Sequence, residues 1–368
     1  MSLTVLSVAY PLTPVGPNAV GGSEQILTLM DAALTAAGHR SLVVACRGSD
    51  PAGTLIPTPR WTREITPEVR RWAQEQHRIA IEQTLKRWPV DLIHMHSLDF
   101  WSYLPSGAVP ILTTLHLPPD WYPADIFKLR RQNLWLNCVS STQTESCPKG
   151  TRLLPYIGNG VDIDRLTLPL RKRNFALALG RICPEKGLHI ALDAARRAGV
   201  DLLLAGEVYR YEAHERYFKN EIQPRLDTHR RFLGPAGFRR KRRLLTQARC
   251  LLIPSLVAET SSLVAMESLS CGTPVIAYPS GALPEIIEDG RTGFLVASER
   301  EMASALRAVK FLDPRVCREQ ARERFSADRM ARLYMDRYHD LIASQTPLLK
   351  PTLPAAIPSL RHAQQSGR

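Results

Sequence analysis

The stretch CLLIPSLVAETSSLVAMESLSCGTPVIAY, residues 250–278, holds an apolar run, a helical pattern and a second apolar run. Cys250–Ile253 and Pro274–Tyr278 are short and almost wholly apolar, which predicts buried strands. Ser262–Ser270 between them predicts a helix. A strand, a crossover helix and a second strand are typical of a parallel α/β sheet covered on both faces.

The same alternation runs through most of the chain. In the first part we predict strands at Thr4–Ala9, Ser41–Ala45, Leu92–Met95, Ile111–Thr114 and Leu136–Val139, with helices at Ser23–Ala37 and Glu68–Arg87. A turn-forming run, YIGNGVDIDR at 156–165, then breaks the pattern. Beyond it we predict further strands at Phe175–Leu179, Asp201–Ala205 and Arg231–Leu233, and helices at Gly187–Ala198, Tyr211–Glu221 and Phe238–Ala248.

We therefore expect an α/β protein with two Rossmann-like domains facing a cleft. A chain of 368 residues is too long for one ordinary core. The expected domains are residues 1–157 and 158–326, and a last helix at 327–344 is expected to pack back on the first domain. The Pro-rich segment 345–368 has no clear period and is expected to be a disordered tail.

The composition indicates a soluble globular protein, with 44% hydrophobic and 23% charged residues. The chain has no stretch of 18 apolar residues, so we predict no membrane span. The first residues resemble a buried strand rather than a signal peptide. The seven cysteines are scattered and form no C-x-x-C pair, so we expect reduced cysteines in a cytoplasmic protein and no zinc site.

The formal net charge of +13 requires an anionic partner or a solvated basic surface. The chain has no motif of interleaved basic and aromatic residues, so we expect no nucleic-acid partner. The remaining candidate partners of the basic surface are anionic small molecules and an anionic membrane. One expectation is that the protein contacts the inner membrane face peripherally. The basic clusters lie at 70–71, 128–131, 171–173 and 239–243.

Two strand-to-helix junctions carry the marks of phosphate binding. In NAVGGSEQ, residues 18–25, Gly21 and Gly22 permit close approach to the backbone, and the following helix start offers free N–H groups. In GRICPEKG, residues 180–187, Arg181 and Lys186 are two cations that can converge on one diphosphate. The alternatives are an ordinary glycine turn and two solvated surface cations.

Glu259 and Glu267 stand on either side of seven residues without charge. Glu259 falls in the loop after a strand, and Glu267 lies about two turns into the following helix. Carboxylates accept hydrogen bonds from sugar hydroxyls, so the pair suits two parts of one nucleotide sugar better than one acid–base pair. The alternative is a structural pair, with Glu259 as a helix cap.

These motifs together resemble retaining glycosyltransferase family 4 of the GT-B fold. The resemblance covers residues 1–344 and includes the two glutamates, GRICPEKG, the Gly21–Gly22 turn, NGVD at 159–162, LHLP with His116, and residues 271–296. The segment 205–227 looks like the subset typified by an avilamycin-pathway glycosyltransferase. The family commonly has E-x-F-G where this chain has Glu259-Thr260-Ser261-Ser262, a departure that bears on which sugar is bound.

The resemblance implies a role for each matching residue. Arg181 and Lys186 would bind the donor diphosphate, Glu267 the ribose and Glu259 the transferred sugar, with His116 beside that sugar. Backbone groups would complete the donor site, and they belong to Gly21, Gly22, Leu233 at the base, and Ser262 and Leu263 at the phosphate. The implied reaction is sugar transfer from a nucleoside diphosphate sugar to an acceptor hydroxyl, with no cofactor.

A possible metal motif, Asp162-Ile163-Asp164, falls in the linker rather than at a sheet edge, so we expect no metal on the diphosphate. The acceptor is unspecified and could be a glycan, a lipid-linked molecule or a small molecule. Two other functions are compatible with the same fold, a GT-B nucleotide-sugar epimerase and a non-catalytic sugar-nucleotide-binding module. An epimerase would act on the donor alone, and a binding module would show no turnover.

Overall fold

The computed structural model describes residues 2–345, and its strands form two parallel sheets. The strands of the first sheet are β1 (Thr4–Val8), β2 (Arg40–Cys46), β3 (Thr54–Thr58), β4 (Leu92–Met95), β5 (Ile111–Thr114), β6 (Leu134–Asn137) and β7 (Leu153–Leu154). Those of the second are β8 (Phe175–Leu179), β9 (Asp201–Ala205), β10 (Arg230–Phe232), β11 (Cys250–Ile253), β12 (Val275–Ala277) and β13 (Gly293–Leu295). The strand orders are β3-β2-β1-β4-β5-β6-β7 and β10-β9-β8-β11-β12-β13.

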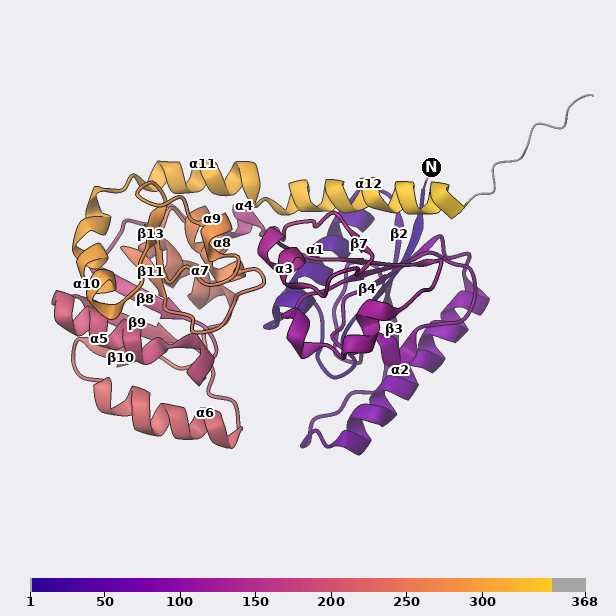
Figure 1. The fold of residues 1–368 in the computed structure, drawn as a ribbon, viewed down its shortest axis with the longest axis horizontal. Coiled ribbons are helices and arrows are strands. Elements are labelled where there is room, and N and C mark those ends of the chain that lie inside the picture. The colour runs from indigo at the N-terminus through magenta and orange to yellow at the C-terminus, as the bar shows by residue number, and fades with distance from the viewer. Residues whose placement is uncertain (1, 346–368) are drawn as a thin grey trace, which may run out of the picture.

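Helices connect these strands and cover the sheets (Figure 1). Those of the first unit are α1 (Gly22–Ala36), α2 (Pro67–Arg87) and α3 (Ser141–Ser146). The second unit contains α4 (Ile163–Leu166), α5 (Leu188–Ala198), α6 (Glu212–Tyr217), α7 (Phe238–Gln247), α8 (Leu263–Ser270), α9 (Leu283–Ile286), α10 (Glu299–Ala308) and α11 (Pro314–Arg324). The helix α12 (Ala327–Gln345) follows. Each unit is thus a Rossmann-like α/β domain, as the sequence predicted.

The central strands are buried and mostly apolar because both faces of each sheet are covered. In β8, Ala176 and Ala178 pack in the core formed with α5 and α10, whereas Leu177 belongs to the core on the other face, with α8 and α11. Successive strand residues point to opposite faces, so a short unbroken apolar run serves two cores. Because the central strands are parallel, their carboxyl ends lie at one edge of each sheet, where ligands bind in such folds.

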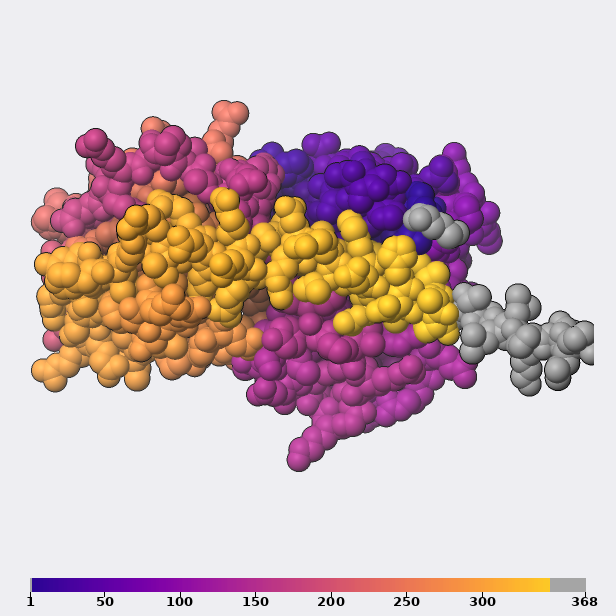
Figure 2. Space-filling view, turned by 90° about the horizontal axis from the view of Figure 1, so that it is seen from above, coloured from indigo at the N-terminus to yellow at the C-terminus, as the bar shows by residue number. Residues whose placement is uncertain are grey.

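The helix α12 leaves the second unit and runs along the first (Figures 1 and 2). Tyr334 and Tyr338 are fully buried in one core with Ile26 and Met30 of α1. Burying side chains of this size stabilises the docked helix by about 2 kcal/mol each. The crossing is fixed where the chain enters α12, because Val161 pairs with Ser326 through hydrogen bonds to the neighbouring residues Phe325 and Ala327.

Several strands have the predicted bounds, among them β4, β5, β8, β9 and β11. Three strands and five helices were missed, namely β3, β7, β13, α3, α4, α9, α10 and α11. β3 is an edge strand that contains Pro57, and proline lowers a strand prediction although an edge strand tolerates it. The predicted tail lies outside the described residues. None of the described helices is both long and apolar enough to cross a membrane.

Candidate functional site

A cavity of about 550 Å³ lies between the two units. The first unit contributes residues 18–22, in the loop that follows β1, together with Gln25 of α1. The second unit contributes residues after β8, β9 and β11, and the beginnings of α7 and α8. The cavity therefore lies at the carboxyl edges of the parallel strands, where the alternation of strands and helices predicts ligand binding.

Most of the predicted site residues line this cavity. They are Gly21, Gly22, Arg181, Lys186, Glu259, Ser262, Leu263 and Glu267. Leu233 does not, since it directly follows β10, with its N–H bonded to Leu204 and its carbonyl accepting from Arg240. Residues 235–238 line the cavity in its place. His116 also lies outside the lining.

Lys186 and Glu259 form an ion pair in the cavity wall. The Lys186 Nζ lies 2.5 Å from Glu259 Oε1, and the Ser255 hydroxyl donates to the same oxygen at 2.7 Å. The lysine is placed by the turn Pro184–Lys186 that ends at Gly187. Gly187 has φ +58°, and a Cβ there would lie 2.2 Å from the Pro254 carbonyl oxygen, so only glycine permits this approach of the two loops.

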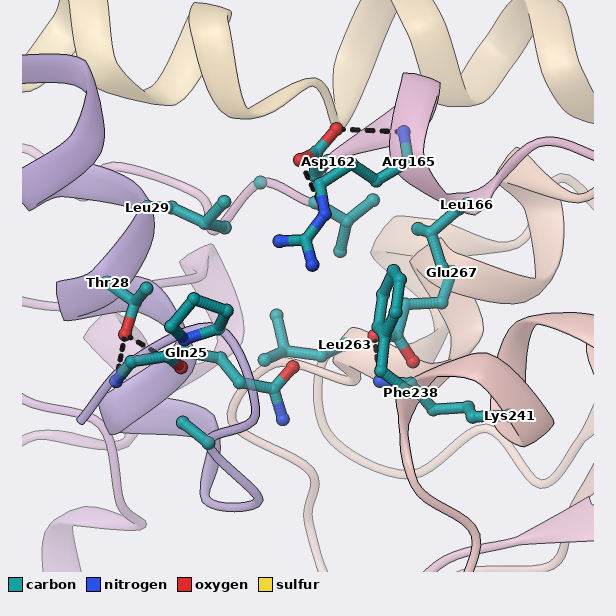
Figure 3. Close-up of a pocket in the computed structure, with 15 residues that line it drawn as sticks. Gln25, Thr28, Leu29, Asp162, Arg165, Leu166, Phe238, Lys241, Leu263 and Glu267 are labelled. Carbon is teal, nitrogen blue, oxygen red and sulfur yellow. Dashed lines mark hydrogen bonds and ion pairs between the residues drawn. The ribbon is translucent and has the colours of Figure 1, made fainter. Parts of the chain in front are cut away.

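Glu267 is paired with a lysine that the sequence interpretation assigned to the basic surface. The Lys241 ammonium on α7 donates to Glu267 Oε1 on α8, beside Phe238 and Leu263 (Figure 3). Glu267 is buried, and its ion pair spans 26 positions of sequence. The sequence carries only a weak signal for Lys241, because it stands in a run of five basic residues.

The two glutamates share a pattern that leaves acceptor capacity for a ligand. Each binds its lysine through Oε1, and within residues 2–345 neither Oε2 accepts a hydrogen bond. Arg181 differs from both lysines, since it is exposed and forms no ion pair in that range. The cavity wall therefore presents one unpaired guanidinium, two paired lysines and two carboxylate oxygens.

The starts of helices α8 and α1 also line the cavity, next to its cationic side chains. The α8 helix begins at Leu263 without a side-chain cap, and in the described chain the N–H groups of Leu263 and Val264 donate to no protein acceptor. Ser261 lies beside them, and among the described residues its buried hydroxyl has no hydrogen-bond partner. Free N–H groups and the helix dipole favour an anion here.

The start of α1 is occupied differently. The cap position is Gly21, and no side chain caps the helix there. The Ser23 hydroxyl instead donates to Glu24 Oε2 at 3.1 Å. A Cβ on Gly21 would lie 2.0 Å from that oxygen, so this glycine makes room for the buried Glu24 carboxylate. Burial raises the pKa of Glu24.

His116 lies in a row of three neighbouring histidines, His94, His96 and His116, outside the cavity lining. Its Nε2 lies 3.2 Å from His96 Nδ1, and the His96 ring packs against His94. Burial lowers the pKa of His116 to about 4, so its ring is neutral near pH 7. Its carbonyl accepts a 3.0 Å hydrogen bond from Thr260, the residue after Glu259. His116 thus contacts the donor-side loop through its backbone.

The two aspartates of the linker lie at the start of α4, away from the large cavity. Asp162 caps α4 by accepting from the Arg165 N–H at 3.0 Å, and Figure 3 shows the Asp162 carboxylate turned to Arg165. Asp164 is exposed in the first turn of that helix. Asp162 lines a smaller cavity of about 60 Å³ together with Lys241 and Glu267.

Two family models match adjoining parts of the chain. "Glycosyltransferase Family 4" matches residues 20–165, and "Glycosyl transferases group 1" matches residues 163–327. The chain belongs to the family 4-like GT-B glycosyltransferases. This confirms the family and the fold that the sequence motifs predicted.

Curated and solved relatives agree with this family. A glycogen synthase of Mycobacterium tuberculosis is 25% identical over 88% of this chain and 89% of its own length. A phosphatidyl-myo-inositol mannosyltransferase of Mycobacterium leprae is 25% identical over 84% of this chain and 88% of its own. The crystal structure of AviGT4, an avilamycin A biosynthesis glycosyltransferase, covers 93% of this chain and 98% of its own at a TM-score of 0.68 and 22% identity, a likeness of fold.

In this glycosyltransferase the carboxylate of Glu285 bridges the two domains. Glu285 of α9 accepts hydrogen bonds from the N–H groups of Ser141 and Thr142 at 3.0 and 2.7 Å, and from the Thr142 hydroxyl at 2.5 Å. Glu285 therefore caps α3 from the opposite domain. It lies in the matched motif 271–296, but no local sequence signal indicates that its partner is a helix start 143 positions earlier.

Proposed function

We propose that this glycosyltransferase moves a sugar from a nucleoside diphosphate sugar to an acceptor hydroxyl, with retention at the anomeric carbon and without a metal ion on the diphosphate. The observation that carries the proposal is the interdomain cavity in which Arg181, Lys186, Glu259 and Glu267 converge. Anion-binding groups and hydroxyl acceptors in one cavity suit a ligand with a diphosphate between two sugars.

The diphosphate would bind Arg181, Lys186 and the N–H groups of Leu263 and Val264. Glu267 Oε2 would accept from the ribose hydroxyls, and Glu259 Oε2 from the transferred sugar. The loop at residues 235–238 would contact the base, close to the position first assigned to Leu233. The backbone of Gly21 and Gly22 would contact the diphosphate from the first domain. The backbone of His116, rather than its ring, would lie near the sugar.

The leaving diphosphate gains negative charge as the glycosidic bond breaks. Fixed cations and helix N–H groups stabilise that charge directly, which is the role a divalent ion has in other transferases. The aspartates of the linker are unsuited to hold such an ion on the diphosphate, since Asp162 already caps α4. No side chain is assigned as a general base, and the donor phosphate would itself assist the acceptor hydroxyl. No cofactor is part of the proposal.

Relatives support a nucleotide-sugar donor and leave several acceptors open. The Anabaena protein HepE was crystallised with UDP-glucose, and its fold matches this chain at a TM-score of 0.67 over 92% of the chain, with 18% identity. The M. leprae relative is named for a lipid acceptor and the M. tuberculosis relative for a glycan. A glycan, a lipid-linked or a small-molecule hydroxyl is compatible here.

The test has two stages. Thermal shifts with a panel of nucleotide sugars identify the donor, since a ligand that binds the native state stabilises it by mass action. NMR of the product with an acceptor panel then reports transfer and the anomeric configuration. An inverted anomer would overturn retention. Conversion of the donor alone would favour an epimerase, and binding without any turnover would favour a binding module.

A further inference from the structure

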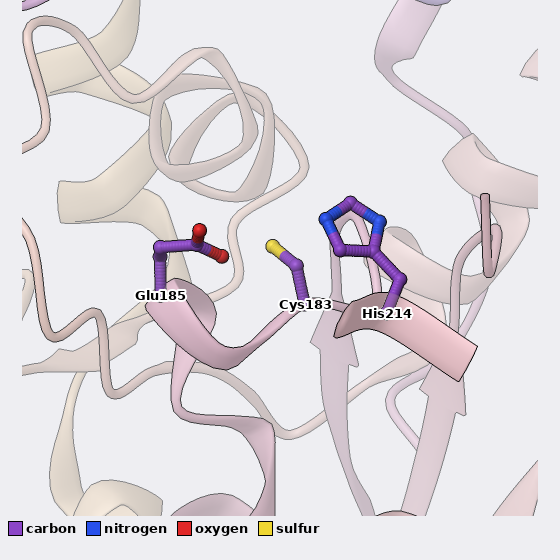
Figure 4. Close-up of side chains that lie close together, drawn as sticks. All are labelled: Cys183, Glu185 and His214. Carbon is purple, nitrogen blue, oxygen red and sulfur yellow. The ribbon is translucent and has the colours of Figure 1, made fainter. Parts of the chain in front are cut away.

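Three side chains with metal-binding atoms meet behind the Arg181–Lys186 loop. Cys183 precedes the turn Pro184–Lys186, Glu185 lies in that turn, and His214 comes from α6. One ligand atom from each residue lies within 4.8 Å of the others. Figure 4 shows the Cys183 sulfur between the Glu185 carboxylate and the His214 ring. None of the three lines the donor cavity.

Two atoms of this cluster are buried without a partner. Within residues 2–345 the Oε2 of Glu185 and the Nδ1 of His214 have no hydrogen-bond partner, and His214 is only 8% exposed. Cys183 is fully buried, with its sulfur 3.7 Å from the Arg181 carbonyl. Native proteins pair nearly all buried polar atoms, so two unpaired ligand atoms that face one thiol call for a further partner.

We infer that Cys183, Glu185 and His214 form a Zn²⁺ site that ties the donor loop to α6. Thiolate, imidazole and carboxylate are the zinc ligands of proteins, at bonds of roughly 2.0–2.3 Å. In a tetrahedral site such bonds place ligand atoms roughly 3.4–3.8 Å apart. The three atoms therefore need only a small change of side-chain torsions. Three protein ligands leave a fourth position for water.

No local sequence pattern indicates this site, because its ligands lack the short repeated spacing of zinc motifs. Cys183 and Glu185 are two positions apart, and His214 follows 29 positions after Glu185. The parallel pairing of β8 and β9 brings the loops after these strands together. Sequence analysis therefore predicted no zinc site, and only the fold places a histidine opposite the thiol.

Zinc here has a consequence for the donor loop. Binding displaces the thiol proton, and the ion balances the charges of one thiolate and one carboxylate. The ion thereby balances the charge of the Glu185 carboxylate, so the loop that carries Arg181 and Lys186 becomes more favourable for a diphosphate. The zinc site itself does not depend on the proposed sugar transfer, whereas this effect on the donor does.

The test is a titration of the metal-free protein with Zn²⁺ against a chromophoric chelator, with Tm measured at each step. We expect one equivalent to bind and Tm to rise. Cys183→Ser and His214→Gln should each weaken binding at least about 100-fold, and Glu185→Gln about tenfold. Co²⁺ should give a thiolate charge-transfer absorption in the wild type that Cys183→Ser lacks.

Matched controls exclude binding elsewhere. Cys147→Ser removes a thiol that lies 3.6 Å from Cys138, His229→Gln removes an exposed histidine paired with Asp201, and Glu215→Gln changes the residue beside His214. All three should bind zinc like the wild type. Circular dichroism of the metal-free variants checks that they fold.

Two results would overturn the inference. One is a wild type that takes up no zinc against the chelator. The other is unchanged zinc affinity in folded Cys183→Ser and His214→Gln. A failure of nucleotide sugars to bind would overturn the proposed function alone, because the zinc titration contains no donor.

Discussion

Lys186 Nζ lies 2.5 Å from Glu259 Oε1 across the wall of the donor cavity. The side chains are 24% and 11% exposed, so the pair is largely shielded from water. The lysine fixes one carboxylate oxygen and leaves the other toward the cavity. Arg181, by contrast, has no ion-pair partner in the described residues. The two cations of the donor loop are therefore not equivalent, and their variants should behave differently.

The two glutamates should fail in different ways when they are replaced. Glu267→Ala should weaken both nucleoside and nucleoside diphosphate binding by about 1.5–3 kcal/mol, because a charged hydrogen-bond acceptor is lost. Glu259→Ala should leave nucleoside diphosphate binding within about twofold and lower kcat, since its contact is with the transferred sugar. Calorimetry and initial rates measure both.

Removing Glu267 also leaves the Lys241 ammonium unpaired, and this unpaired charge can reduce ligand binding by destabilising the fold. Glu267→Gln and Lys241→Met separate these effects, because the first keeps the shape and the second removes the partner charge. If Glu259→Ala and Glu267→Ala both fold and leave binding and rates unchanged, the two glutamates have a structural role only.

Arg181→Ala should weaken nucleoside diphosphate binding while leaving bare nucleoside affinity intact. The unpaired guanidinium is free to form two hydrogen bonds with phosphate oxygens, and charge-assisted bonds of this kind contribute about 1.5–3 kcal/mol. Lys186→Ala should have a smaller effect, because its charge is already balanced by Glu259. Arg315→Ala, an exposed arginine on α11, is the control. Equal losses for both ligands would contradict the diphosphate role.

Ser261→Ala should reduce kcat/KM for the donor about 3- to 10-fold, the effect of one hydrogen bond of about 0.5–1.5 kcal/mol. Its buried hydroxyl has no protein partner and lines the cavity, where the family commonly has phenylalanine. Nucleoside diphosphate affinity should not change. Ser280→Ala, whose hydroxyl donates to Val257 outside the cavity, serves as the control. An unchanged donor preference across a sugar panel would remove Ser261 from the sugar site.

Glu285→Ala should loosen the contact between the domains. The variant loses a helix cap worth about 1–2 kcal/mol and three hydrogen bonds to Ser141 and Thr142. Small-angle scattering should show a larger radius of gyration, and Tm should fall. Glu145→Ala, which removes an exposed carboxylate from α3 itself, should show neither change. An unaltered scattering curve for Glu285→Ala would rule out this clamp.

Added Mg²⁺ or Mn²⁺ should change turnover by less than about twofold, because fixed cations neutralise the leaving diphosphate. Asp162→Ala should lower stability by about 1 kcal/mol through loss of the α4 cap and retain donor binding. Asp164→Ala, on the same turn, should be neutral. A chelator should have no effect in Cys183→Ser, where the zinc site is absent. Activity that Mn²⁺ alone restores would contradict this prediction.

The basic surface should bind anionic lipid at low salt if the acceptor is lipid-linked, at about 1 kcal/mol for each basic residue near the surface. Sedimentation with phosphatidylserine vesicles at low and physiological salt measures this. Neutral vesicles are the control. Absence of binding at either salt would favour acceptors in solution.

Local sequence was enough for the central strands and for the βα loops that carry ligand residues. β4, β5, β8, β9 and β11 are short, mostly apolar runs that are buried except at Leu179 and Asp201, so their pattern can be read from the sequence itself. Edge strands such as β3 and β13 were missed, because partial exposure weakens the apolar signal. The motif positions of Arg181, Lys186, Glu259 and Glu267 likewise followed from their place after strands.

Sequence alone thus determined the fold class, the family and which loops face the cavity, because strand and helix periodicities are local properties. Only the tertiary structure decided the partners: Lys186 with Glu259, Lys241 with Glu267, Glu285 with α3, and Cys183 with His214. The residues of the first three pairs are 26 to 143 positions apart in the sequence, and Cys183 and His214 follow the neighbouring strands β8 and β9. Their meeting depends on strand order and on how the two sheets pack, which no local pattern encodes.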